Sequence, residues 1–79
     1  MHVEIITPET TIFTGADISL VQLPGLDGSF EILNNHAPLI AALRKGKVKL
    51  IKQDKTTTFF DISGGMVEVA KNKILILAE

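Results

Sequence analysis

The sequence contains no cysteine, tryptophan or tyrosine, only two histidines, and no long hydrophobic run. Without cysteine, neither a disulfide framework nor a cysteine-based zinc site can supplement the core. The interrupted apolar segments are far shorter than the roughly 20 residues of a membrane helix. The formal net charge is only −1, which argues against a general nucleic-acid binder or a polybasic membrane anchor. Because the N-terminus also lacks the basic start and apolar run of a signal peptide, we expect a soluble intracellular domain.

What the sequence does contain is β-branched side chains: Ile, Val and Thr make up 22 of its 79 residues. Such side chains suit the pleated, half-buried surface of a sheet. Turn residues such as Pro24-Gly25 and Gly64-Gly65 divide the chain into segments of strand length rather than helix length. The total length allows one small domain over residues 1–79. Strands are predicted over residues 2–7, 10–15, 17–23, 29–33, 46–53, 57–63, 66–70 and 73–78.

Alternation of side chains supports several of these strands. Val48 and Leu50 alternate with lysines, and Val67 and Val69 alternate with Met and Glu, so these four residues are predicted to face the core. Residues 74–77 are apolar on both faces, which predicts either a central strand within the fold or a surface that a partner covers.

Residues 38–43 hold the only stretch that favours helix, but six residues are too few for a stable one. We interpret them as an extended connection or a single turn. About eight or more short strands in so short a chain cannot form one open sheet with a usable core. The sequence therefore predicts an all-β fold, a flattened β-sandwich or barrel of two antiparallel sheets with about 8–10 short strands.

No constellation of residues predicts catalysis. A nucleophile needs a base within reach, yet the only histidines are His2, near a terminus, and His36, and there is no Gly-x-Ser-x-Gly elbow. Two distant histidines without cysteines or clustered carboxylates do not predict a metal site. A glycine-rich phosphate loop of standard spacing is also absent. We therefore expect a binding or structural domain with no catalytic residues, no metal and no cofactor.

Residues 44–55 carry six of the eight positive charges. Such a run is able to follow a phosphate backbone, as in oligonucleotide-binding barrels. Those barrels stack bases on aromatic side chains, however, and none of the four phenylalanines lies among these lysines. The interpretation that we favour is a solvated strand face whose lysines discourage edge-to-edge pairing.

Residues 23–39 are dense in turn residues yet keep Phe30, Ile32 and Leu33, which predicts an ordered pair of loops. His36 in this segment has two interpretations. In the favoured one it hydrogen-bonds nearby backbone and fixes the loop. In the other it faces a partner, where a change of charge near about pH 6–7 matters.

This segment resembles the epsilon chain of F-type ATP synthases, called delta in mitochondria. Members carry Pro-Gly-x-x-Gly, followed by Ile-Leu and by His-Ala-Pro-Leu. The matching residues are Pro24, Gly25, Gly28, Ile32, Leu33, His36, Ala37, Pro38 and Leu39. Residues 5–15, 60–69 and 74–78 resemble the family's opening strands, its Ser-Gly-Gly-x-x-Glu-Val strand pair and its apolar final strand. The resemblance covers residues 2–79, and four motifs in order at matching spacing make it specific.

Two residues depart from the family pattern. Glu31 stands where glycine is usual, and if that position needs a positive φ, the local turn must differ here. Asn34 stands where proline is usual, but Asn34-Asn35 is still able to form a tight turn because Asn tolerates left-handed angles. The family commonly continues into a C-terminal pair of helices that restrain ATP hydrolysis or bind ATP in some members. Since this sequence stops at Glu79, we expect no such hairpin and do not transfer those properties.

The resemblance implies a non-catalytic subunit of a proton-translocating rotary ATP synthase, in the central stalk of the rotor. It implies two partners, the gamma subunit and the polar loops of the membrane c-ring, and contact with the membrane only through that ring. The implied location is the cytoplasmic face of the inner membrane in a bacterium, or the matrix or stromal side in an organelle. The ring-facing loop is Asp27, Gly28, Ser29, Phe30 and Glu31. The residues facing gamma are Thr7, His36, Ala37, Pro38, Leu39, Ala41 and Leu43.

Within the ring-facing loop, Asp27 and Glu31 are expected to pair with basic groups of the ring. Phe30 is either a contact or, as we favour, a plug of the core. Two alternatives to the stalk subunit remain open. A biotinyl or lipoyl carrier domain has a similar size and fold, but it needs a lysine beside a methionine at a hairpin tip; Lys55 lacks that context. A single-strand-binding barrel, in contrast, would bind nucleic acid in a salt-sensitive way.

Overall fold

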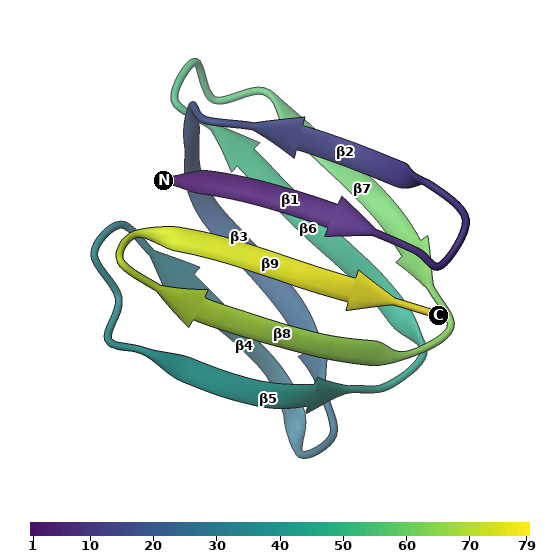
Figure 1. Ribbon diagram of the computed structural model, residues 1–79. Coiled ribbons are helices and arrows are strands. Elements are labelled where there is room, and N and C mark those ends of the chain that lie inside the picture. Colours follow the sequence, from purple (N-terminus) through teal and green to yellow (C-terminus); the bar gives the residue numbers. More distant parts are fainter.

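The computed structural model describes residues 1–79, which form nine strands and no helix (Figure 1). It therefore has no helix of the length and apolar character that crossing a membrane requires. The strands are β1 (His2–Ile6), β2 (Thr11–Gly15), β3 (Ile18–Gly25), β4 (Gly28–Leu33), β5 (Leu39–Leu43), β6 (Gly46–Lys52), β7 (Thr57–Ile62), β8 (Gly65–Ala70) and β9 (Lys73–Ala78).

The nine strands form one sheet that curls back on itself. Its order is β2-β1-β9-β8-β5-β3-β6-β7, with β4 added to β3. A single residue pair, Gly25 with Leu43, joins β3 to β5, so the sheet bends at this point into two layers. We call β2-β1-β9-β8-β5 the front layer and β4-β3-β6-β7 the back layer, as they lie in Figure 1. The all-β sandwich prediction is confirmed, although the two layers are parts of one curled sheet.

One strand pair departs from the predicted antiparallel arrangement. β1 runs parallel to β9, with His2 opposite Lys73 and Ile6 opposite Leu77. All other paired strands are antiparallel. β9 therefore lies between β1 and β8, and the prediction of a central strand for residues 74–77 is confirmed. The prediction of purely antiparallel sheets was wrong, because side-chain alternation is the same for both strand directions.

A second difference concerns residues 38–43, which the sequence did not predict as a strand. Leu39–Leu43 forms β5 and pairs with β8 over five residue pairs, from Leu39 opposite Val69 to Leu43 opposite Gly65. The helix propensity of Ala41 and Ala42 is worth only a few tenths of a kcal/mol per residue. The ladder with β8 and the burial of every second side chain outweigh that preference.

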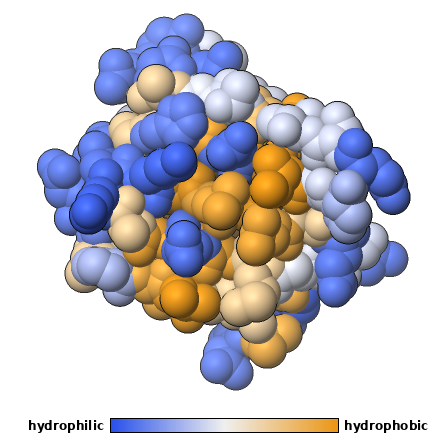
Figure 2. All heavy atoms as spheres, in the orientation of Figure 1, coloured by the Kyte–Doolittle hydropathy of each residue, from blue (hydrophilic) through white to orange (hydrophobic).

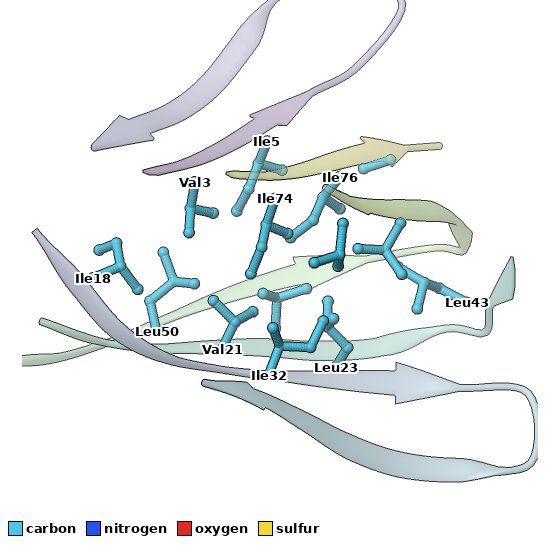
Figure 3. Packing of buried hydrophobic residues seen from close by; sticks show 14 of the residues in the cluster. Val3, Ile5, Ile18, Val21, Leu23, Ile32, Leu43, Leu50, Ile74 and Ile76 are labelled. Atoms are coloured by element: carbon cyan, nitrogen blue, oxygen red, sulfur yellow. The ribbon is translucent and has the colours of Figure 1, made fainter. Parts of the chain in front are cut away.

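The core lies between the two layers and is entirely apolar (Figure 3). Alternation predicted four of its members correctly: Val48 and Leu50 are fully buried, and Val67 and Val69 are almost so. β9 contributes Ile74 and Ile76, which point toward the back layer in Figure 3. The sixteen buried apolar residues are Met1, Val3, Ile5, Ile18, Val21, Leu23, Ile32, Leu43, Val48, Leu50, Ile62, Val67, Val69, Ile74, Ile76 and Ala78.

The two departures from the family pattern have local explanations. Glu31 lies within β4 opposite Gln22, and it is not among the residues with positive φ, so a glycine-only conformation is not used there. Asn35 has φ 63°, the left-handed angle that Asn tolerates. The side-chain Oδ1 of Asn34 accepts a hydrogen bond from the Met1 nitrogen at 2.7 Å. The Asn pair thus makes the turn and also fastens it to the start of β1.

Candidate interaction site

The interior of this protein contains no polar or charged residue that could form a site. No polar or charged residue is buried, and no buried side-chain nitrogen or oxygen lacks a partner. No three His, Asp or Glu side chains gather in a way that could hold a metal ion. His36 is exposed, and its Nδ1 lies 2.6 Å from the Ala37 carbonyl oxygen, which agrees with the loop-fixing interpretation. The features that need explanation are therefore on the surface.

The outer side of the front layer carries a continuous apolar surface, visible as the orange area across β9 and β8 in Figure 2. Strand register brings its members together. Ile6 pairs with Leu77, Leu77 with Met66, and Met66 with Ala42, so one row of apolar side chains crosses four strands. The neighbouring row adds Ile40 and Leu75. We call this the front apolar face; its residues are Ile6, Ile40, Ala42, Met66, Leu75 and Leu77.

The front apolar face is well exposed, and two acidic residues stand in its second row. Ile40 is 66% exposed, Met66 46% and Leu77 44%. In the second row Glu4 and Glu68 flank Leu75, so that Glu68 lies between Leu75 and Ile40. An exposed apolar row with polar residues beside it is typical of a protein–protein interface. Isolated surface leucines are common, but three large apolar side chains in register on neighbouring strands are not explained by the fold itself.

The residues predicted to face gamma lie around this face rather than on it. Thr7 borders a shallow groove with Met66 and Leu77 at one end. His36, Ala37 and Pro38 are exposed at the other end, just before β5, and Pro38 borders a groove with Ile40.

Within β5 the outward positions are the even-numbered ones. Leu39 and Ala41 are half-buried and pack against the core, and Leu43 is a core residue with 4% exposure. The predicted surface role of Leu43 therefore does not fit its position. Ile40 and Ala42 are the residues that β5 turns to solvent. The sequence analysis missed them because it had not assigned a strand there.

The segment predicted to face the ring, Asp27 to Glu31, forms part of the tip of the hairpin between β3 and β4 and the first part of β4. Gly25 pairs with Gly28, leaving Leu26 and Asp27 as the two tip residues. Both are exposed, Leu26 at 61%; the sequence analysis did not single out Leu26. Gly28, the residue that follows the tip, has φ 127°, a conformation that glycine adopts readily.

The remaining residues predicted to face the ring belong to β4 rather than to the tip. Phe30 is half-buried and packs against the core, in agreement with the plug interpretation. Glu31 lies three residues beyond Gly28 on the outer side of the back layer and is exposed. Asp27 and Glu31 therefore lie on different parts of the hairpin. Asp27 is at its tip together with Leu26, whereas Glu31 is on the surface of the sheet.

The basic residues 44–55 lie mainly on β6 and its turn. Lys47 Nζ is 2.8 Å from Asp61 Oδ1, with both side chains well exposed, as expected for a solvated strand face. In the turn to β7, the backbone amide of Thr56 donates to Asp54 Oδ1 at 2.9 Å. Hydrogen bonds from Thr56 lower the pKa of the exposed Asp54 carboxyl below its usual value. Lys55 has φ 72° at this tip, and no methionine adjoins it.

Comparison with known proteins assigns the family. The sequence matches the family model described as "ATP synthase, Delta/Epsilon chain, beta-sandwich domain" over residues 1–79. This chain belongs to that family. The epsilon-chain resemblance predicted from residues 2–79 is thereby confirmed.

Relatives named ATP synthase epsilon chain are similar over nearly the whole sequence. The chain is 47% identical to that of Chlorobium limicola over 76 residues, which cover 96% of this chain and 85% of the relative. It is 43% identical to that of Caulobacter vibrioides over 79 residues, covering 100% and 90%. With Symbiobacterium thermophilum the identity is 44% over 79 residues, but these make up only 56% of the relative. Epsilon-chain relatives thus include both short and much longer proteins.

Two solved structures share the fold. A chain from the central stalk and c-ring of the Tetrahymena thermophila mitochondrial ATP synthase superposes with a TM-score of 0.84 at 22% identity, covering 99% of this chain and 62% of that one. A chain of the Euglena gracilis mitochondrial ATP synthase gives a TM-score of 0.90 at 16% identity, covering 96% and 48%. At such low identity the likeness concerns the epsilon-family fold alone.

Proposed function

We propose that this protein is a non-catalytic subunit of the central stalk of a proton-translocating F-type ATP synthase, coupling rotation of the gamma subunit to the membrane c-ring. Its family membership over residues 1–79 supports this proposal. So does its similarity to relatives named ATP synthase epsilon chain. The single structural observation that carries it is the front apolar face, since a rotor component needs a stable protein–protein interface and no cleft for a substrate.

The geometry suits a part that transmits torque. Stiff β-branched side chains fill the core between the two layers, which belong to one hydrogen-bonded sheet. The body therefore resists deformation. The front apolar face and the tip at Leu26 and Asp27 are separate surfaces. We assign the front apolar face, with Thr7 and the stretch 36–38 at its ends, to the gamma subunit. The hairpin tip is assigned to the polar loops of the c-ring.

The same assignment gives a location. The subunit is held at the membrane indirectly, through the c-ring. In a bacterium this corresponds to the cytoplasmic face of the inner membrane, and in an organelle to the matrix or stromal side. It uses no cofactor or catalytic residue of its own, because the enzyme is the whole synthase.

Substitution on the front apolar face tests the proposal. The wild-type chain, added to a synthase core lacking it, is expected to co-purify with the gamma subunit and to restore coupling of ATP hydrolysis to proton pumping. Met66→Glu places a charge in the middle of the face, where an interface leaves it without a partner, and we expect about 100-fold weaker binding and loss of coupling. Pull-down on tagged gamma and a proton-pumping assay in vesicles measure the two effects.

The matched control is Leu33→Glu, which places the same charge at a residue 56% exposed on the back layer. It is expected to bind gamma and couple as the wild type does. If Met66→Glu assembles and couples normally, the front apolar face is not the gamma interface. If the wild-type chain itself neither binds nor restores coupling, the stalk function is contradicted.

Charge reversal at the hairpin tests the ring contact separately. Asp27→Lys is expected to weaken attachment to the c-ring on the order of tenfold and to make it less sensitive to salt, because a basic partner in the ring loses its counter-charge. Glu31→Lys changes a side chain on the sheet surface rather than at the tip, so its effect should be smaller. Binding to detergent-solubilised c-ring at two salt concentrations measures both. Unchanged attachment and coupling after reversal of both charges would remove the ring assignment.

A further inference from the structure

β7 is a sheet edge without the usual protection against pairing. It ends the strand order, and its register with β6 is regular from Gly46 opposite Ile62 to Ile51 opposite Thr57. Its six residues include no lysine, proline or bulge, and the charge of its one acidic residue, Asp61, is paired with Lys47 of β6. Natural edge strands usually carry one of these devices, since an open row of backbone groups accepts another strand. The edge strand β2, in contrast, has a register shift against β1.

The free backbone groups of β7 can be identified from one hydrogen bond. The Lys52 amide donates to the Thr56 carbonyl oxygen at 2.9 Å, which makes Ile51 and Thr57 a non-hydrogen-bonded pair. Pairs alternate along an antiparallel ladder. The N–H and C=O groups that point away from β6 therefore belong to Thr57, Phe59 and Asp61. These three residues are exposed, so every second residue of the strand offers both a donor and an acceptor.

The side chains on the inner side of β7 are already packed within the chain. The ring of Phe60 lies 5.4 Å from that of Phe13 on β2, centroid to centroid, at 54°. Both residues are half-buried and pack against the core. This contact fixes which side of β7 faces inward, while Phe59 stays 55% exposed on the outer side. The edge is therefore held ready in the conformation that strand addition requires.

We propose that β7 pairs with β7 of a second copy of this chain, forming an antiparallel sheet that continues across two back layers. When a two-fold axis through Phe59 relates the two copies, the residues of one β7 lie opposite complementary residues of the other. Phe59 lies opposite the partner's Phe59, Thr57 opposite the partner's Asp61, and Thr58 opposite the partner's Phe60. The strand thus places an aromatic pair at the centre and an acid opposite a hydroxyl on each side.

The self-complementary register favours a second copy over an unrelated strand. In this register no like charges lie opposite each other, and Asp61 is already paired within its own chain with Lys47. The dimer uses neither the front apolar face nor the hairpin tip. The inference therefore goes beyond the stalk function and concerns the protein outside the synthase. Strand addition by another protein is a competing outcome that the experiment separates.

The test is sedimentation equilibrium of the full chain over a range of concentrations, with two variants. The wild type is expected to dimerise reversibly. Phe59→Glu should raise the dimer dissociation constant at least about tenfold, because it brings two carboxylates together at the two-fold axis. It leaves the monomer folded, since position 59 faces Lys49 in its own sheet. Leu33→Glu on β4 should dimerise as the wild type does.

Amide hydrogen exchange identifies the pairing strand. The amides of Thr57, Phe59 and Asp61 are expected to become protected as the protein concentration rises. Those of Thr58 and Phe60 should be protected at all concentrations. The proposal is overturned if the chain stays monomeric with concentration-independent exchange at these three amides. It is also overturned if Leu33→Glu rather than Phe59→Glu prevents dimerisation, or if the three amides become protected only when other synthase subunits are added.

Discussion

Gly65→Ala is expected to destabilise the protein by more than about 3 kcal/mol, which is a large part of the stability of so small a domain. Gly65 begins β8 with φ 141°, and a Cβ built there lies 2.0 Å from the carbonyl oxygen of Leu77 on β9. Because the obstacle is backbone rather than a movable side chain, β8 and β9 must separate to admit the methyl group. Chemical denaturation followed by circular dichroism measures the free energy of unfolding.

Gly28→Ala is the matched control for this prediction. Gly28 has a similarly positive φ of 127°, but no atom lies within 4 Å of the position that a Cβ would take. Alanine there suffers only the backbone strain, about 1–2 kcal/mol. An equal loss of stability in the two variants would show that strain, and not contact with Leu77, makes glycine necessary at position 65.

Ile76→Ala is expected to lower the free energy of unfolding by about 3 kcal/mol. Ile76 is completely buried between the layers, so truncation removes apolar contacts and leaves a cavity whose rigid β walls cannot collapse. The midpoint of urea denaturation should fall while its slope stays unchanged, because the folded state keeps its shape.

The neighbouring residue provides the comparison. Leu77 is on the same strand but faces outward and is 44% exposed, so Leu77→Ala is expected to cost less than about 1 kcal/mol. The two variants thus separate the core side of β9 from its interface side. Equal destabilisation by both would mean that the outer side of β9 is needed for folding, which would contradict its assignment to the front apolar face.

Local signals in the sequence were enough for most of the strands. β6 could be predicted because lysines alternate with Val48 and Leu50, and β8 because Val67 and Val69 alternate with longer side chains. Turn residues marked where these segments end. The hairpin between β3 and β4 could likewise be located from residue chemistry, since the turn signals Pro24-Gly25 and Asp27-Gly28 stand on either side of its tip. The motif in residues 23–39 was enough to indicate the family.

β5 shows where local signals failed. Its residues Leu39–Leu43 have no strong alternation and include two alanines, so nothing in the segment itself indicated a strand. Only the ladder with β8 makes it one, and only that ladder determines that Ile40 points outward and Leu43 inward. The misplaced surface role of Leu43 follows from this missing strand, because a one-residue change of phase exchanges the two faces of a strand.

The sequence by itself determined the all-β class, the core side of β6 and β8, most of the turns and the epsilon-chain family, since each depends on residue type and short-range spacing. The tertiary structure decided that β1 lies parallel to β9, that one curled sheet forms both layers, and that Met66, Leu77 and Ile40 meet in a single exposed face. The physical reason is that alternation fixes which side of a strand is apolar. The neighbours of that strand, and the layer that covers it, depend on contacts between residues far apart in the chain.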